Sequence, residues 1–173
     1  MIAVAMFIGA CGDTSDNAGG SDASVEVQRY IDTVNPMFKE ANAAGDANDK
    51  EIPPPSAESE AGDAKRWFDR SIGIQEKLVG ALGGVVDPPV ELKEAHADYL
   101  AAQSELLAFN RRIRDRLADA GSDFKMSQLA NDPELGTAPQ RRLGDLADGA
   151  CKELERIANQ SNVNVDLSCL RMR

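Results

Sequence analysis

The chain is poor in aromatic residues and in histidine. Its 173 residues include one Trp, two Tyr, five Phe and one His, so aromatic residues make up 5% of a chain that is 42% hydrophobic. Alternating β-branched and aromatic runs bounded by turn signals are nearly absent, which argues against a β-sheet. A thin, Ala-rich core suits close helix packing, so we expect an all-α fold.

Basic residues are also scarce. The chain has 19 Lys and Arg against 29 Asp and Glu, which gives a formal net charge of −10. Binding to nucleic acid requires a basic surface that displaces counterions from phosphates, so we expect no nucleic-acid partner. No apolar run reaches the roughly 20 residues that a membrane-spanning helix needs.

Residue patterns that carry common catalytic chemistry are missing as well. No Ser-His-Asp set, Gly-rich phosphate loop or metal-spaced cluster is visible. The single histidine is His96. A di-metal carboxylate bundle would place a glutamate three residues before it, but that residue is Lys93. We therefore expect no enzyme, no cofactor and no metal site, and we interpret His96 as a helix-face residue.

The longest periodic pattern in the chain runs from Leu92 to Leu117. Its apolar residues recur at intervals of three and four: Leu92, Ala95, Tyr99, Ala102, Leu106, Phe109, Ile113 and Leu117. No Gly or Pro lies between Pro89 and Gly121, so the pattern predicts a helix over 89–119. Because such a helix cannot bury its apolar stripe alone, other amphipathic segments must pack against it.

Two segments before this helix have helical periodicity. The first starts at an N-cap, Ser24, and we expect Pro36 to kink or break it and Gly45 to end it. A long polar loop with a proline run is predicted over 45–60. The second helix is predicted over 62–82, and the short connection that follows makes it an antiparallel neighbour of the long helix.

The remainder of the chain predicts a short helix around Phe124, Met126 and Leu129, and a last helix from Pro139 to Gln160. After Gln160 the apolar period changes to two, which predicts an extended tail. Residues 24–173 are thus predicted to form an antiparallel helical bundle of three long helices plus a short one, with an extended C-terminal tail.

Residues 1–10 are uncharged and mostly apolar, and they end in the sequence Ile8-Gly9-Ala10-Cys11. This pattern resembles the lipobox of bacterial lipoproteins, in which an aliphatic and two small residues precede the cysteine that is acylated. The resemblance implies a signal segment over 1–10, lipidation of Cys11 and a location on the extracytoplasmic face of a bacterial cell membrane. Residues 11–23 are small and polar, which predicts a flexible tether.

One feature departs from the lipoprotein pattern. No Lys or Arg precedes Cys11, whereas a signal peptide opens with a basic region, and a start upstream of Met1 would supply one. The alternative is an apolar N-terminus buried in the bundle, with Cys11 in the core.

Lipidation of Cys11 would leave Cys151 and Cys169 as a pair, in a compartment that permits disulfides. The extended tail is long enough to return to Cys151, so we predict a disulfide, with two free thiols as the alternative. The pattern Cys-x-x-Leu followed by Val-x-Val-Asp-Leu-x-Cys resembles the ends of other uncharacterised helical envelope lipoproteins, and it implies no activity.

Two side-chain groups are candidates for binding. Trp67 and Phe68 are core residues or, with Tyr99, one side of a ligand or partner groove. Four arginines cluster near the end of the long helix, either as an ion-paired face or as an anion patch: Arg111, Arg112, Arg114 and Arg116.

These features predict a membrane-anchored lipoprotein with a binding or structural role, in contact with another envelope protein or a wall component. The alternative is a small-ligand-binding helical module with a pocket near Trp67, Phe68 and Tyr99. The sequence leaves the oligomeric state open.

Overall fold

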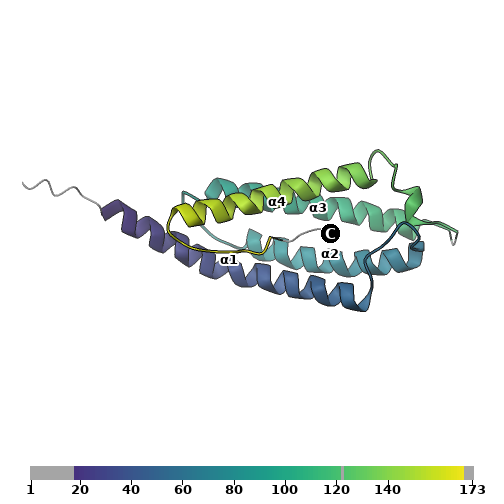
Figure 1. Cartoon of the computed structure of the whole chain (residues 1–173), viewed down its shortest axis with the longest axis horizontal. Coiled ribbons are helices and arrows are strands. Elements are labelled where there is room, and N and C mark those ends of the chain that lie inside the picture. The colour runs from purple at the N-terminus through teal and green to yellow at the C-terminus, as the bar shows by residue number, and fades with distance from the viewer. Residues whose placement is uncertain (1–17, 122, 170–173) are drawn as a thin grey trace, which may run out of the picture.

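The fold is a bundle of long α-helices. The computed structural model describes residues 18–121 and 123–169. These residues form α1 (Ala18–Glu51), α2 (Ala61–Gly83), α3 (Lys93–Ala118) and α4 (Thr137–Gln160), with one turn of 3-10 helix, η1 (Met126–Gln128). The helices share one long axis, and the first turns of α1 project beyond the others (Figure 1). The described residues contain no strand, so the all-α class is confirmed.

The first helix is longer than its sequence pattern predicts. α1 begins at Ala18 rather than Ser24, and it passes through Gly45 to Glu51. Residues 18–23, which lie in the predicted tether, are therefore helical, whereas residues 11–17 of that tether lie outside the described residues. The predicted end at Gly45 is wrong, and the connection to α2 is confined to 52–60.

Pro36 does not end α1, so of the predicted kink or break, the break is wrong. A proline inside a helix removes one amide donor and crowds the preceding turn. Val34 and Phe38, on either side of it, are both fully buried. Their packing against the other helices holds α1 together across the proline.

The second and third helices follow their sequence patterns closely. α2 matches the predicted range to within one residue at each end. α3 starts at Lys93, after a turn in which the Leu92 amide donates to the Pro89 carbonyl at 2.9 Å. The two prolines before it therefore belong to the connection rather than to the helix.

The connection between α3 and α4 holds less helix than predicted. The short helix expected around Phe124, Met126 and Leu129 is only the single turn η1. Leu129, directly after η1, is 4% exposed and anchors the connection in the core. α4 starts at Thr137, two residues before Pro139, and ends at Gln160 as predicted.

The core divides into two clusters along the bundle. One joins α1 from Val27 to Ala41, the end of α2, the start of α3, the end of α4 and residues 163–167. The other joins the start of α2, the end of α3 and the start of α4. Among the described residues, no buried member of this second cluster comes from α1. The end of α1, from Asn42 to Glu51, therefore has little apolar packing and depends on polar contacts with α2.

Residues after Gln160 leave the helix and run back along the bundle. Val163 and Leu167 are buried in the first core cluster, whereas Asn164 and Asp166 are exposed. The alternation predicted from the sequence is thus present in the burial of these side chains. None of the described helices combines the length and apolar content that a membrane crossing requires.

Candidate functional site

A cleft of about 600 Å³ lies between α1 and α4. It exists because α1 packs on α2 and α4 packs on α3, whereas α1 and α4 make few contacts with each other. The cleft is lined mainly by polar residues of all four helices: Asn42, Asp46, Asp49, Trp67, Ser71, Gln75, Gln103, Asn110, Gln140, Asp148, Lys152 and Glu155.

The floor of the cleft carries three buried amide side chains. Asn110 Nδ2 donates to Gln75 Oε1 at 2.8 Å, which joins α3 to α2. Gln103 Nε2 donates to the Tyr99 hydroxyl at 3.0 Å. Gln103 Oε1 accepts no hydrogen bond, although the side chain is only 1% exposed. A buried acceptor without a donor costs on the order of 1–3 kcal/mol, so a donor that reached this oxygen would remove that cost.

One end of the cleft is built where α1 meets α2. The half-buried Trp67 donates from Nε1 to Asp49 Oδ1 at 2.9 Å, and its ring meets Phe68 edge-on at 5.1 Å between centroids. Asn48 Nδ2 donates to the Ser71 hydroxyl at 3.2 Å. These contacts hold the last turn of α1 at a fixed place beside the cleft.

The charge around the cleft is predominantly negative. Its lining includes one cationic side chain, Lys152, and five carboxylates: Asp46, Asp49, Asp148, Glu155 and Asp166. Lys152 pairs with Asp148 at 2.5 Å, so its charge is directed at only one of the five. An opening lined in this way attracts cations and repels anions.

The C-terminal residues form a further side of the cleft. Asp166, Ser168 and Cys169 line it, and the Leu167 amide donates to Glu155 Oε1 at 2.7 Å. Cys169 is joined to Cys151 of α4 as a disulfide with a Cα–Cα distance of 5.8 Å, which is the predicted pairing. The disulfide therefore fixes the segment that completes the cleft.

Of the three aromatic residues predicted to form a groove, Trp67 and Phe68 are in contact, but Tyr99 lies apart from them in the other core cluster. Trp67 lines the cleft, but Phe68 is 3% exposed in the second core cluster. Tyr99 is 1% exposed in the first cluster, where its ring stacks on Phe38 at 5.2 Å between centroids. Of the predicted groove, only Trp67 lies at the candidate site.

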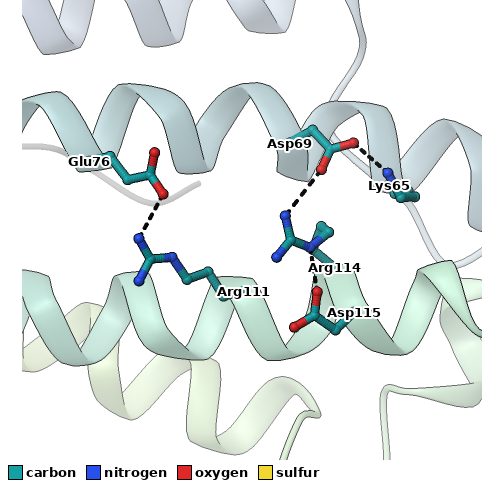
Figure 2. Close-up of polar contacts among 6 residues, drawn as sticks. All are labelled: Lys65, Asp69, Glu76, Arg111, Arg114 and Asp115. Atoms are coloured by element: carbon teal, nitrogen blue, oxygen red, sulfur yellow. Dashed lines mark hydrogen bonds and ion pairs between the residues drawn. The ribbon is translucent and has the colours of Figure 1, made fainter.

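Two of the clustered arginines pair with carboxylates of α2 (Figure 2). Arg111 lies 2.7 Å from Glu76, and Arg114 lies 3.6 Å from Asp69 and 2.6 Å from Asp115. The hydrogen bond to Asp115 is the main cause that raises the pKa of Arg114. The pairs with Glu76 and Asp69 tie α3 to α2 on the outside of the bundle, whereas the pair with Asp115 lies within α3.

The other two clustered arginines lie over aromatic rings. The Arg112 guanidinium is 5.8 Å from the centroid of Phe109, and that of Arg116 is 5.7 Å from Phe124. All four arginines thus have partners within the chain. Two of the four are ion-paired and two lie over rings, so the choice between an ion-paired face and an anion patch stays open.

His96 lies inside the bundle rather than at its surface. It is 7% exposed, and its Nδ1 is 2.8 Å from the Tyr30 hydroxyl. Burial lowers the pKa of His96. The side chain is a structural polar group between α1 and α3. The chain has no second histidine that could act with it.

Within 18–121 and 123–169, one group of potential metal ligands converges: Cys151, Glu155 and Cys169. Both sulfurs are already used in the disulfide, so this group does not fit a metal ion. Cys11, the predicted lipidation site, lies outside the described residues.

Comparisons with protein-family models, with curated proteins and with solved structures found no match for this chain. The geometry of the cleft is therefore the basis for assigning its function.

The buried amides of the cleft floor were missed by sequence reasoning, although a signal for them exists. Gln103 and Asn110 continue the α3 spacing of Tyr99, Leu106 and Ile113 at intervals of three and four. Polar residues in register with an apolar stripe are placed inside a bundle, where they must pair with each other or with a ligand.

Proposed function

We propose that this protein is a small-ligand-binding helical module and that the cleft between α1 and α4 is its binding site. The observation that carries the proposal is Gln103 Oε1, a buried acceptor without a donor on the cleft floor. The cleft volume of about 600 Å³ falls within the roughly 300–1,000 Å³ typical of ligand sites. A ligand donor to Gln103 would remove the cost of that unpaired group.

The proposal includes a location. The resemblance of Ile8-Gly9-Ala10-Cys11 to a lipobox supports a lipid anchor at Cys11 on the extracytoplasmic face of a bacterial membrane. The Cys151–Cys169 disulfide is consistent with such a compartment, because disulfides persist where the environment is oxidising. A ligand would then reach the cleft from the cell envelope.

The proposal also includes the finer topology. Each core cluster combines the starts of some helices with the ends of their neighbours, which supports an antiparallel order of the four. Alternating burial at Val163 and Leu167 supports an extended course for the tail.

A second candidate role is contact with an envelope protein or a wall component. Val86 and Val90, in the connection between α2 and α3, are 82% and 80% exposed. Exposed apolar side chains that lie close together often mark protein contacts. Cross-linking from this connection in intact cells would test the role, and capture of no envelope component would contradict it.

Trp67 provides the test of the ligand site, because it is the only tryptophan and it lies beside the cleft. A panel of small envelope metabolites of varied charge is titrated against the protein while Trp67 fluorescence is recorded. We expect at least one compound to give a saturable change that Gln103→Met weakens. If no compound gives such a change, the ligand-binding proposal is wrong.

The anchor has a separate test. Protein is expressed from its full upstream reading frame, isolated from native membranes and mapped by mass spectrometry. We expect a first peptide that begins at an acylated Cys11. A peptide that retains Met1 to Ala10 with a free Cys11 thiol would contradict lipidation.

A further inference from the structure

We infer that the ligand of this cleft is an elongated organic cation that carries two or more ammonium groups, of which the linear polyamines are the simplest examples. The inference rests on the proposed ligand site and adds the chemical class of its occupant. It follows from the signs of the lining charges, their spacing and the unpaired acceptor on the floor.

The lining of the cleft carries more negative than positive charge. Five carboxylates and one lysine line the cleft, and the lysine is paired with Asp148. Asp46 and Asp49 come from α1, Glu155 from α4 and Asp166 from the tail, so acidic groups occupy three sides. An anion would meet repulsion from each of these sides, whereas a cation would be attracted by all of them.

The spacing of the carboxylates favours an extended cation over a metal ion. Asp148 and Glu155 are two helical turns apart on α4, about 10 Å at roughly 1.5 Å per residue. In the described part of the chain, no three of the cleft carboxylates converge closely enough to hold one ion, because the only such group contains the disulfide. A chain with several separated positive charges matches separated carboxylates better than one compact charge does.

The floor and one end of the cleft also favour a cationic ligand. Gln103 Oε1 needs a donor, and an ammonium group has up to three N–H donors and no acceptor. Trp67 lies half-buried beside Asp49 at one end, where an indole face and a carboxylate together favour a cation. Both groups therefore select the same kind of ligand as the surrounding charges.

The test uses spermidine as the probe and an uncharged diol of equal chain length as its matched control. Binding to the full chain is measured by isothermal titration calorimetry and by Trp67 fluorescence, at low and at physiological salt. We expect saturable binding of spermidine that weakens with salt, since charge attraction is screened. The diol is expected not to bind.

Paired variants locate the site. Asp49→Asn with Asp148→Asn removes two cleft charges and keeps hydrogen-bond acceptors for Trp67 and Lys152. We expect spermidine affinity to fall about tenfold or more. The control pair, Asp32→Asn with Asp98→Asn, changes net charge equally at exposed positions outside the cleft and is expected to leave affinity within about twofold.

Each contrary result overturns a defined claim. Equal losses in the two variant pairs would mean diffuse surface attraction, and the inference would be wrong. If spermidine does not bind but a neutral or anionic compound binds at the cleft, the cation class is wrong while the ligand site stands. If no probe of any charge perturbs Trp67, both proposals fail together. Thermal unfolding of each variant, measured in parallel, identifies losses that come from misfolding.

Discussion

At the scale of single residues, Tyr30 and His96 form a buried polar pair between α1 and α3. Their rings meet edge-on at 5.7 Å between centroids, and burial raises the pKa of Tyr30 while it lowers that of His96. Both side chains are therefore held neutral in the folded protein. In the unfolded chain, however, the imidazole is free to take up a proton near pH 6.5.

This difference predicts a pH dependence of stability. Because the folded-state pKa of His96 lies below its unfolded value, the unfolded state binds more protons as the pH falls through about 6.5. The free energy of unfolding should therefore decrease from pH 7.5 to pH 5.5 and level off below the lowered pKa. Urea unfolding at each pH measures it.

His96→Gln is the variant that isolates the effect. It removes the titrating ring, so its unfolding free energy should change less over the same pH interval. Tyr30→Phe keeps the imidazole and removes its hydrogen bond, and it should keep a pH dependence while losing about 1 kcal/mol at pH 7.5. A wild-type pH dependence in His96→Gln would show that other groups are responsible.

Gly136, at the entry to α4, is enclosed by backbone carbonyls. A Cβ at this position would lie 2.5 Å from the Asp132 oxygen and 2.7 Å from those of Ala130 and Leu129. The turn is further fixed by Asp132, whose side chain accepts the Glu134 amide at 2.8 Å. Since the obstructing atoms are backbone, they can move only if the turn itself changes.

Gly136→Ala is accordingly expected to destabilise the protein by about 1–3 kcal/mol. Gly149→Ala is the matched control, because Gly149 lies inside α4 with no atom within 4 Å of the added Cβ. It should stabilise the fold by about 0.5–1 kcal/mol through helix propensity. Chemical denaturation of both variants measures the difference, and an equal response would contradict the steric explanation.

At the scale of elements, α1 contains a proline between two buried residues, Val34 and Phe38, whose packing requires the chain to stay helical. The Pro36 ring removes one amide donor from the middle of the helix. Pro36→Ala should therefore raise the free energy of unfolding, by up to about 3 kcal/mol, with part of the gain offset by a less restricted unfolded chain. Thermal unfolding and helix content measured by circular dichroism would check this, and a lower melting temperature would contradict it.

The periodic stripes of α2, α3 and α4 made these elements predictable from the sequence. The α3 stripe contains no glycine or proline, and the apolar stripes of α2 and α4 continue across internal glycines, so the local and the tertiary preferences largely agree. α1 was predicted too short because Pro36 and Gly45 are local stop signals, whereas its burial is decided by contacts far along the chain.

The cleft was harder to predict than the helices that build it. It depends on α1 and α4 remaining apart, and nothing in either helix alone encodes that distance. Gln103 gave a usable signal because a polar side chain in an apolar stripe needs a partner. The position of Trp67 beside Asp49 gave none, since their pairing arises only from the packing of α1 on α2.

At the scale of the whole molecule, the disulfide ties the end of the chain to α4. It closes a sequence separation of 18 residues, for which chain-entropy models give a stabilisation of about 3 kcal/mol. Replacing both Cys151 and Cys169 with Ser should lower the unfolding free energy by about that amount. Unfolding of the wild type with a reductant should match the double variant, whereas no effect of the reductant would contradict the pairing.

The position of Cys169 also has a consequence for maturation. One side of the cleft consists of residues near the end of the chain, and the bond that holds them there requires an oxidant. Without that bond, the residues that form this side of the cleft are not covalently tied to α4. If the proposed ligand site and envelope location are right, a chain still in a reducing compartment would lack the finished cleft, and binding competence would follow export and thiol oxidation.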